Sequence, residues 1–161
     1  MIEQKNLTGF PSIDKPWLKY YSEESINSPI PACTIYELLW NNNKNSLNDI
    51  ALNYYDRKIT YRELFEGIEK ATKAFATLGV KKGEIVAICS VNTPETVYAF
   101  YALNRLGAIA NMIDPRTNVE GVQHYLEECK IRIVVTIEVA YALFEKVNTN
   151  YNIERKKRLS N

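Results

Sequence analysis

The residues best placed for chemistry are Asp114 and Arg116, which directly follow the apolar run AIANMI. If that run is a strand of an open α/β sheet, both side chains lie at its carboxyl end, where such sheets bind ligands. A carboxylate and a guanidinium there can contact a charged ligand. They can also form a turn, in which the aspartate caps backbone amides and the arginine is solvated. The sequence leaves both interpretations open.

Other polar residues do not predict a reactive site. His124 is the single histidine, and no second ligand accompanies it, so we expect a surface or packing role rather than a metal site. Glu127 and Glu128 are adjacent and diverge on a helix, which argues against a catalytic pair of carboxylates. We therefore predict no catalytic residue and no metal ligand in this chain, and only Asp114 and Arg116 as candidates on the ligand side.

Composition indicates one globular domain. The chain has 161 residues, of which 46% are hydrophobic and 24% charged. Its 20 basic residues nearly balance 19 acidic ones, so no overall field favours nucleic acid or an anionic membrane. No run reaches the roughly 18 apolar residues of a membrane span, and MIEQKNLTGFPS lacks the apolar core of a signal peptide. Three separated cysteines are typical of reduced thiols, so we expect a cytoplasmic location. They are Cys33, Cys89 and Cys129.

The most clearly marked element is a helix over residues 61–78. Thr60 and Glu63 form a capping box at its start. Gly79 and Val80 fit a Schellman ending. Apolar residues recur at three- and four-residue spacing, which predicts one buried face.

The following elements predict the fold class. Short apolar runs at 85–89, 108–113 and 131–137 suit buried strands, and helical patterns follow each of them. The helices are expected at 94–106, 118–129 and 138–148. Strand–helix alternation predicts a three-layer α/β fold with a mostly parallel sheet and right-handed crossover helices. Helix 94–106 is apolar almost all round, so it should be buried between layers.

The N-terminal third is less regular. Residues 1–33 read as an extended arm that Trp17, Tyr20 and Tyr21 anchor. Residues 34–150 then form the α/β scaffold, and 151–161 form a solvated basic tail.

Three local signals inside the scaffold predict helix starts and a turn. Capping boxes are expected from Thr34 to Glu37 and from Thr117 to Glu120. The alternating segment DIALNYYDRKITY predicts a β-hairpin that turns at residues 56–57.

Several motifs carry a family resemblance in the same order along the chain. ITYREL, LGVKKGEIVAI, NTPETVYAFYALNRLGAIANMIDPR and HYLEECKIRIVVT together resemble the N-terminal segment of the acyl-adenylate-forming (AMP-binding) enzymes. The likeness runs from about residue 34 to 137, and the lead-in GFPSIDKPWLKYYS looks most like acyl-CoA synthetases. The resemblance implies a complete enzyme that uses ATP and Mg²⁺ to activate a carboxylic acid, then transfers the acyl group to coenzyme A or a carrier thiol. Asp114 and Arg116 could there contact substrate or coenzyme A.

The family's glycine-rich phosphate loop has no counterpart in this sequence. The six glycines are at least four residues apart, whereas such a loop needs clustered glycines so that backbone amides can surround phosphates. We therefore expect no cofactor bound by this chain and no activity of the chain alone.

The sequence is compatible with two functions. The chain can be the scaffold fragment of an acyl-CoA synthetase-like ligase, or a non-catalytic binding or interaction module that keeps this fold. We predict a homodimer or a soluble higher oligomer, with helix 94–106 or strand 131–137 at the contact.

Overall fold

The computed structural model describes residues 7–147 and 155–158. The chain divides into two compact units, Met1–Ala32 and Cys33–Asn161. In the first unit, α1 (Pro11–Asp14), the 3₁₀ helix η1 (Pro16–Tyr20) and α2 (Glu23–Asn27) follow one another. These short helical turns replace the expected extended conformation, because proline begins α1 and η1 and Ser22 caps α2. The three aromatic residues expected to anchor the arm are exposed: Trp17, Tyr20 and Tyr21.

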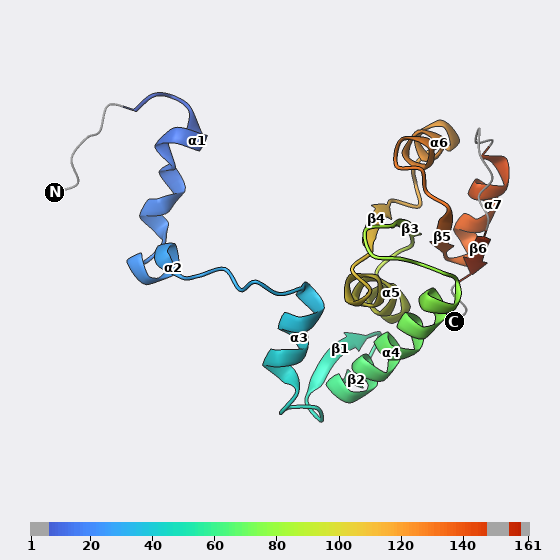
Figure 1. Ribbon diagram of the computed structural model, residues 1–161, viewed down its shortest axis with the longest axis horizontal. Helices are drawn as coiled ribbons and strands as arrows, with labels where there is room; N and C mark the ends of the chain where they lie inside the picture. Colours follow the sequence, from blue (N-terminus) through green and yellow to red (C-terminus); the bar gives the residue numbers. More distant parts are fainter. Residues whose placement is uncertain (1–6, 148–154, 159–161) are drawn as a thin grey trace. The chain divides into compact units, whose positions relative to one another are not determined.

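A parallel sheet forms the centre of the second unit (Figure 1). Its described strands are β3 (Ile85–Cys89), β4 (Ile109–Ile113), β5 (Ile133–Thr136) and β6 (Arg155–Arg158). They lie in the order β4-β3-β5-β6, and each neighbouring pair is parallel. β3 and β5 are nearly continuous runs of buried apolar residues, as expected for strands covered on both faces.

Helices cover both faces of this sheet (Figure 1). α4 (Tyr61–Thr77) and α5 (Pro94–Arg105) pack on one face, and α6 (Val119–Glu128) and α7 (Glu138–Lys146) on the other. The path from β3 to β4 moves across the sheet in one direction over the first face. The paths from β4 to β5 and from β5 to β6 move in the opposite direction over the second face, so all three crossovers have the same hand. The three-layer α/β prediction is confirmed.

The helix α4 has the predicted ends. The Glu63 amide donates to Thr60 Oγ1 over 3.3 Å, and the Thr60 amide donates to Glu63 Oε2 over 2.8 Å. At the other end Gly79 has a φ of 76°, and the Val80 amide donates to the Phe75 carbonyl. This is the Schellman arrangement, in which glycine takes the left-handed conformation without a Cβ clash.

An antiparallel hairpin and a short helix precede α4. The helix α3 (Ile35–Asn43) begins with the predicted capping box of Thr34 and Glu37. The hairpin consists of β1 (Ile50–Tyr54) and β2 (Arg57–Thr60). Its turn residues are Tyr55 and Asp56, with φ values of 47° and 63°, one position earlier than predicted. Two left-handed residues fit a type I′ turn, whose twist matches that of the strands.

Two other local predictions are corrected. α6 is capped by Asn118, whose Oδ1 accepts from the Gly121 amide over 2.9 Å, and not by a box from Thr117 to Glu120. Asparagine is at least as good a cap as threonine, so the helix starts one residue later. Part of the predicted basic tail forms strand β6, and its remaining residues lie outside the described residues. Because β6 pairs with β5, the strand at 131–137 is not an edge of the sheet.

Candidate ligand-binding cleft

A cleft of about 610 Å³ opens at the carboxyl ends of β3, β4 and β5. Residues 90–92, 112–116, 137 and 139 line it. The chain leaves β3 toward the face covered by α5, and it leaves β5 toward the face covered by α7. These two neighbouring strands therefore mark a topological switch point, the place where open α/β sheets bind ligands.

Asp114 and Arg116 face each other at this cleft. Arg116 Nη2 donates to Asp114 Oδ2 over 2.6 Å, and Nε donates to Oδ1 over 3.0 Å. The Arg116 amide also donates to Oδ1, over 2.8 Å. The Arg116 side chain and then its amide lower the pKa of Asp114 to about 2, and the same contacts raise the pKa of Arg116. Both groups are therefore charged at neutral pH.

The same residues close the turn that follows β4. The Thr117 amide donates to the Asp114 carbonyl over 2.9 Å, so Asp114 organises the turn with its side chain and its main chain. The turn that the sequence allowed, with the aspartate side chain accepting from a backbone amide, is therefore formed. The Arg116 side chain is 90% exposed to solvent. Its contact with a ligand stays a prediction.

A buried hydroxyl fixes the loop at the end of β3. Thr96, only 5% exposed, places Oγ1 2.7 Å from Ser90 Oγ and 2.8 Å from the Val91 carbonyl oxygen. The N-cap Thr93 lies on its other side, with the two hydroxyl oxygens 3.1 Å apart. These contacts hold residues 90 and 91 against α5, and both residues line the cleft. Sequence reasoning missed Thr96.

A second hydroxyl joins the ends of β3 and β5. Thr136 is buried, and its Oγ1 donates to the Cys89 carbonyl over 3.0 Å. Burial raises the pKa of the Cys89 thiol, which favours the protonated form. This bond ties together the ends of two strands that lead into the cleft, and the Cys89 thiol stays protonated at neutral pH.

The remaining polar candidates lie on the surface. His124 Nε2 is 3.1 Å from Glu128 Oε2, and both side chains are mostly exposed. Glu127 accepts from Gln123 over 3.2 Å, so the two glutamates point to different partners. Within residues 7–147 and 155–158, no three His, Cys, Asp or Glu side chains could hold a metal ion together. In the same part of the chain, the helices are too short or too polar to cross a bilayer.

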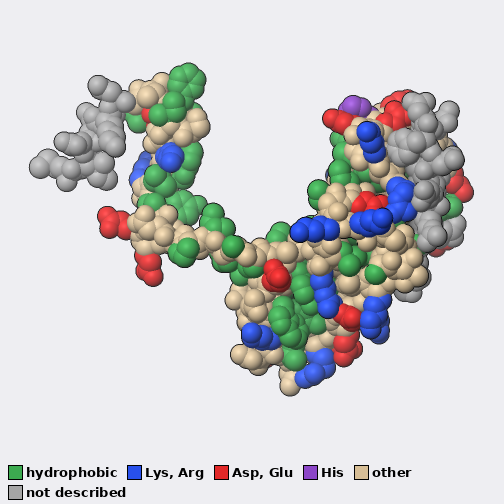
Figure 2. Space-filling view, viewed as in Figure 1, with side chains coloured by type: hydrophobic (Ala, Val, Ile, Leu, Met, Phe, Trp, Pro, Cys, Tyr) green, Lys and Arg blue, Asp and Glu red, His purple; other side chains and the backbone are tan. Residues whose placement is uncertain are grey.

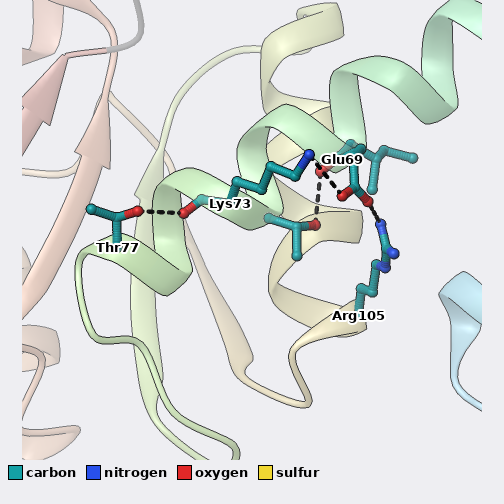
Figure 3. A network of polar contacts seen from close by, with 6 residues as sticks. Glu69, Lys73, Thr77 and Arg105 are labelled. Atoms are coloured by element: carbon teal, nitrogen blue, oxygen red, sulfur yellow. Dashed lines mark hydrogen bonds and ion pairs between the residues drawn. The ribbon is translucent and has the colours of Figure 1, made fainter.

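A second groove, of about 730 Å³, lies between α3, α4 and the end of α5. Figure 3 shows Glu69 of α4 between Lys73 and Arg105, with which it forms ion pairs. The Arg105 guanidinium also lies over the Tyr36 ring, 5.1 Å from its centre. These contacts tie α3, α4 and α5 together, so we interpret the cluster as structural. Acidic and basic side chains are intermixed over this part of the surface (Figure 2), in line with the balanced composition.

Comparison with known proteins places this chain in a family. The AMP-binding enzyme family model matches residues 39–160. The acetyl-coenzyme A synthetase of Dictyostelium discoideum is 35% identical over 82 residues, which are 51% of this chain and 12% of that protein. The long-chain-fatty-acid–CoA ligase of Bacillus subtilis is 23% identical over 136 residues, or 84% of this chain and 24% of that ligase. The chain thus spans less than a quarter of either relative.

Solved structures agree with the observed fold. The anthranilate CoA ligase AuaEII, in complex with anthranoyl-AMP, superimposes with a TM-score of 0.75 and 25% identity. The match covers 81% of this chain and 26% of that one. The N-terminal domain of FACL13 from Mycobacterium tuberculosis gives a TM-score of 0.73 at 20% identity, a likeness of fold. Since the family model covers more than half of the sequence, the chain belongs to the AMP-binding enzyme family.

Proposed function

We propose that this chain is the N-terminal scaffold segment of an ATP-dependent acyl-CoA synthetase-like ligase. The complete enzyme would convert a carboxylic acid and ATP to an acyl-adenylate, then transfer the acyl group to coenzyme A or a carrier thiol. The observation that carries the proposal is the family match over residues 39–160, which contains the sheet and the cleft at its carboxyl end. The named relatives, an acetyl-CoA synthetase and a long-chain-fatty-acid–CoA ligase, point to the same reaction class.

The residues present do not fit the triphosphate of ATP or its Mg²⁺. Glycines lie too far apart in the sequence for a phosphate loop, and the described residues offer no cluster of metal ligands. We therefore assign no step of adenylation to this chain and propose that it is inactive alone. ATP, Mg²⁺ and coenzyme A belong to the complete enzyme.

The cleft is the part of this chain that we assign to the ligand side. Its place at the switch point between β3 and β5 supports this assignment. Arg116 supplies a positive charge that suits a carboxylate or a phosphate group of coenzyme A. Asp114 and Arg116 are thus proposed as ligand-side residues, with no catalytic role.

A cytoplasmic location without a nucleic-acid or membrane partner is part of the same proposal. Balanced charge gives no general attraction to polyanions. Cys33, Cys89 and Cys129 are free thiols, which suits a reducing compartment.

A chimera tests the proposed function. Residues 34–137 would replace the matching segment of the Bacillus subtilis ligase, and thioester formation from a fatty acid, ATP and coenzyme A would be measured. We expect retained activity, and we expect its loss when Ile88, fully buried in β3, is changed to Asp in the same chimera. A chimera that folds yet forms no thioester contradicts the proposal.

A second candidate function is association, as a non-catalytic interaction module or a homodimer. Ile109 and Met112 of β4 are each 52% exposed, and β4 has no partner on its outer side among the described strands. Exposed apolar side chains on an open edge favour pairing with another copy. Light scattering after size exclusion distinguishes a dimer from a monomer of 18.5 kDa. A monomer at micromolar concentration rules out the homodimer.

A further inference from the structure

Asp114 and Arg116, the two charged residues that line the cleft, form an ion pair with each other. We propose that Asp114 is an internal competitor for anionic groups at Arg116, and so weakens the binding of phosphate-bearing ligands in the cleft. This inference rests on the proposed function, which takes the cleft as the ligand side. Beyond that function, it assigns to Asp114 the role of lowering the affinity of the cleft for anionic ligands, without forming a favourable contact with them.

The hydrogen bonds between the two residues show which donor groups of Arg116 are already used by Asp114. Arg116 Nε and Nη2 form one edge of the guanidinium, the edge that binds a carboxylate or phosphate with two parallel bonds. Asp114 accepts from both nitrogens, over 3.0 and 2.6 Å. It also takes the Arg116 amide, which could otherwise donate to an anion. A ligand is left with the terminal edge of the guanidinium.

The formal charge of the residues that line the cleft also indicates weak binding of anions. Asp114 and Arg116 are the charged residues among those that line the cleft, so the formal charge of the lining is zero. A phosphate near Arg116 is also near Asp114, and the repulsion offsets much of the attraction. Because the pKa of Asp114 is held at about 2, the carboxylate keeps its charge throughout the physiological range.

The pair is also easy to open. Its side chains are 90% and 49% exposed, and exposed ion pairs contribute little to stability. Removing the negative charge should therefore leave the fold intact. In Asp114→Asn the amide oxygen can still accept from the Arg116 amide, and the bond from the Thr117 amide to the carbonyl of residue 114 does not involve the side chain, so the turn after β4 keeps both bonds.

Binding of coenzyme A to the purified chain tests the inference, by NMR titration at low ionic strength. We expect Asp114→Asn to bind about threefold more tightly, with a gain that shrinks as salt screens the charges. Arg116→Gln should weaken binding. Asp56→Asn makes the same change of net charge in the β1–β2 turn, outside the cleft, and should have no effect. Asp114→Ser is a second variant without the charge, in case the first does not fold.

The outcomes separate this inference from the proposed function. If Arg116→Gln weakens binding but neither Asp114 variant tightens it, Asp114 positions Arg116 and the inference is wrong, while the cleft remains the ligand side. If Arg116→Gln binds coenzyme A as the unchanged chain does, the cleft does not take this ligand and both fail. Equal tightening by Asp56→Asn would reduce the effect to net charge and would also overturn the inference.

Discussion

The side-chain oxygen of Asn104, near the end of α5, accepts a hydrogen bond of 2.8 Å from the backbone amide of Tyr36 in α3. Amides in the first turn of a helix have no partner within the helix, so Asn104 satisfies one of them across 68 residues of sequence. Together with the Arg105 guanidinium over the Tyr36 ring, this bond holds the start of α3 against α5.

Replacing Asn104 with Ala should therefore lower the free energy of unfolding by about 1–2 kcal/mol, because a partly buried amide loses its acceptor. Chemical denaturation measures the change. Asn42→Ala, at an exposed position of α3, is the matched control and should stay within about 0.5 kcal/mol of the unchanged chain. Equal effects of the two substitutions would show that the bond to Tyr36 carries no stability.

The crossing of α4 and α5 depends on Gly67. A Cβ at this position would lie 2.9 Å from ring atoms of Tyr98, closer than carbon atoms normally approach. Gly67→Ala should destabilise the chain by about 1–3 kcal/mol through this overlap, although alanine is the better helix former. In a Tyr98→Ala background the same substitution should become neutral or stabilising. Thermal unfolding of the four proteins of this cycle measures the difference, and an unchanged cost in both backgrounds contradicts the contact.

Asp114 should titrate at unusually low pH. Its pKa in the folded chain is about 2, below the roughly 3.9 of an unfolded aspartate. A lowered pKa means that the carboxylate stabilises the fold above about pH 4, and that this contribution is lost as the pH falls toward 2. NMR of the carboxyl carbon should follow this titration. In Arg116→Gln the midpoint should rise toward the unfolded value, and a midpoint that stays near 2 would mean that Arg116 is not its cause.

The isolated chain should not catalyse ATP–pyrophosphate exchange with any carboxylic acid. Its sequence lacks the clustered glycines that a phosphate loop requires. Exchange of labelled pyrophosphate into ATP is the measurement, with a complete acyl-CoA synthetase as the positive control. Saturable exchange by a preparation free of other ligases would contradict the prediction.

Elements with strong periodicity could be predicted within two residues from the sequence. The capping box and glycine of α4 and the apolar run of β3 are local signals, so their positions did not depend on the rest of the chain. The hairpin turn was misplaced because Tyr55 and Asp56 take left-handed conformations usually marked by glycine.

Long-range features were less accessible from the sequence. Whether β5 lies at an edge depends on a strand about 20 residues away, which the pattern of β5 does not encode. Asp114 and Arg116 were recognised because they directly follow a strand. Thr96 was not, because its role depends on the loop that folds back over it.

The strand order also determines how this fold can form during synthesis. β3 is the first strand of the sheet to leave the ribosome, yet it lies between β4 and β5, which are made later. The helices α4 and α5 can already pack with β3 and β4 as a local unit, since these four elements are consecutive. The second edge of β3 stays open until β5 emerges. Growth of the nascent chain can therefore extend the sheet outward from β3, and β6, which follows α7 in the chain, is the last described strand to be added.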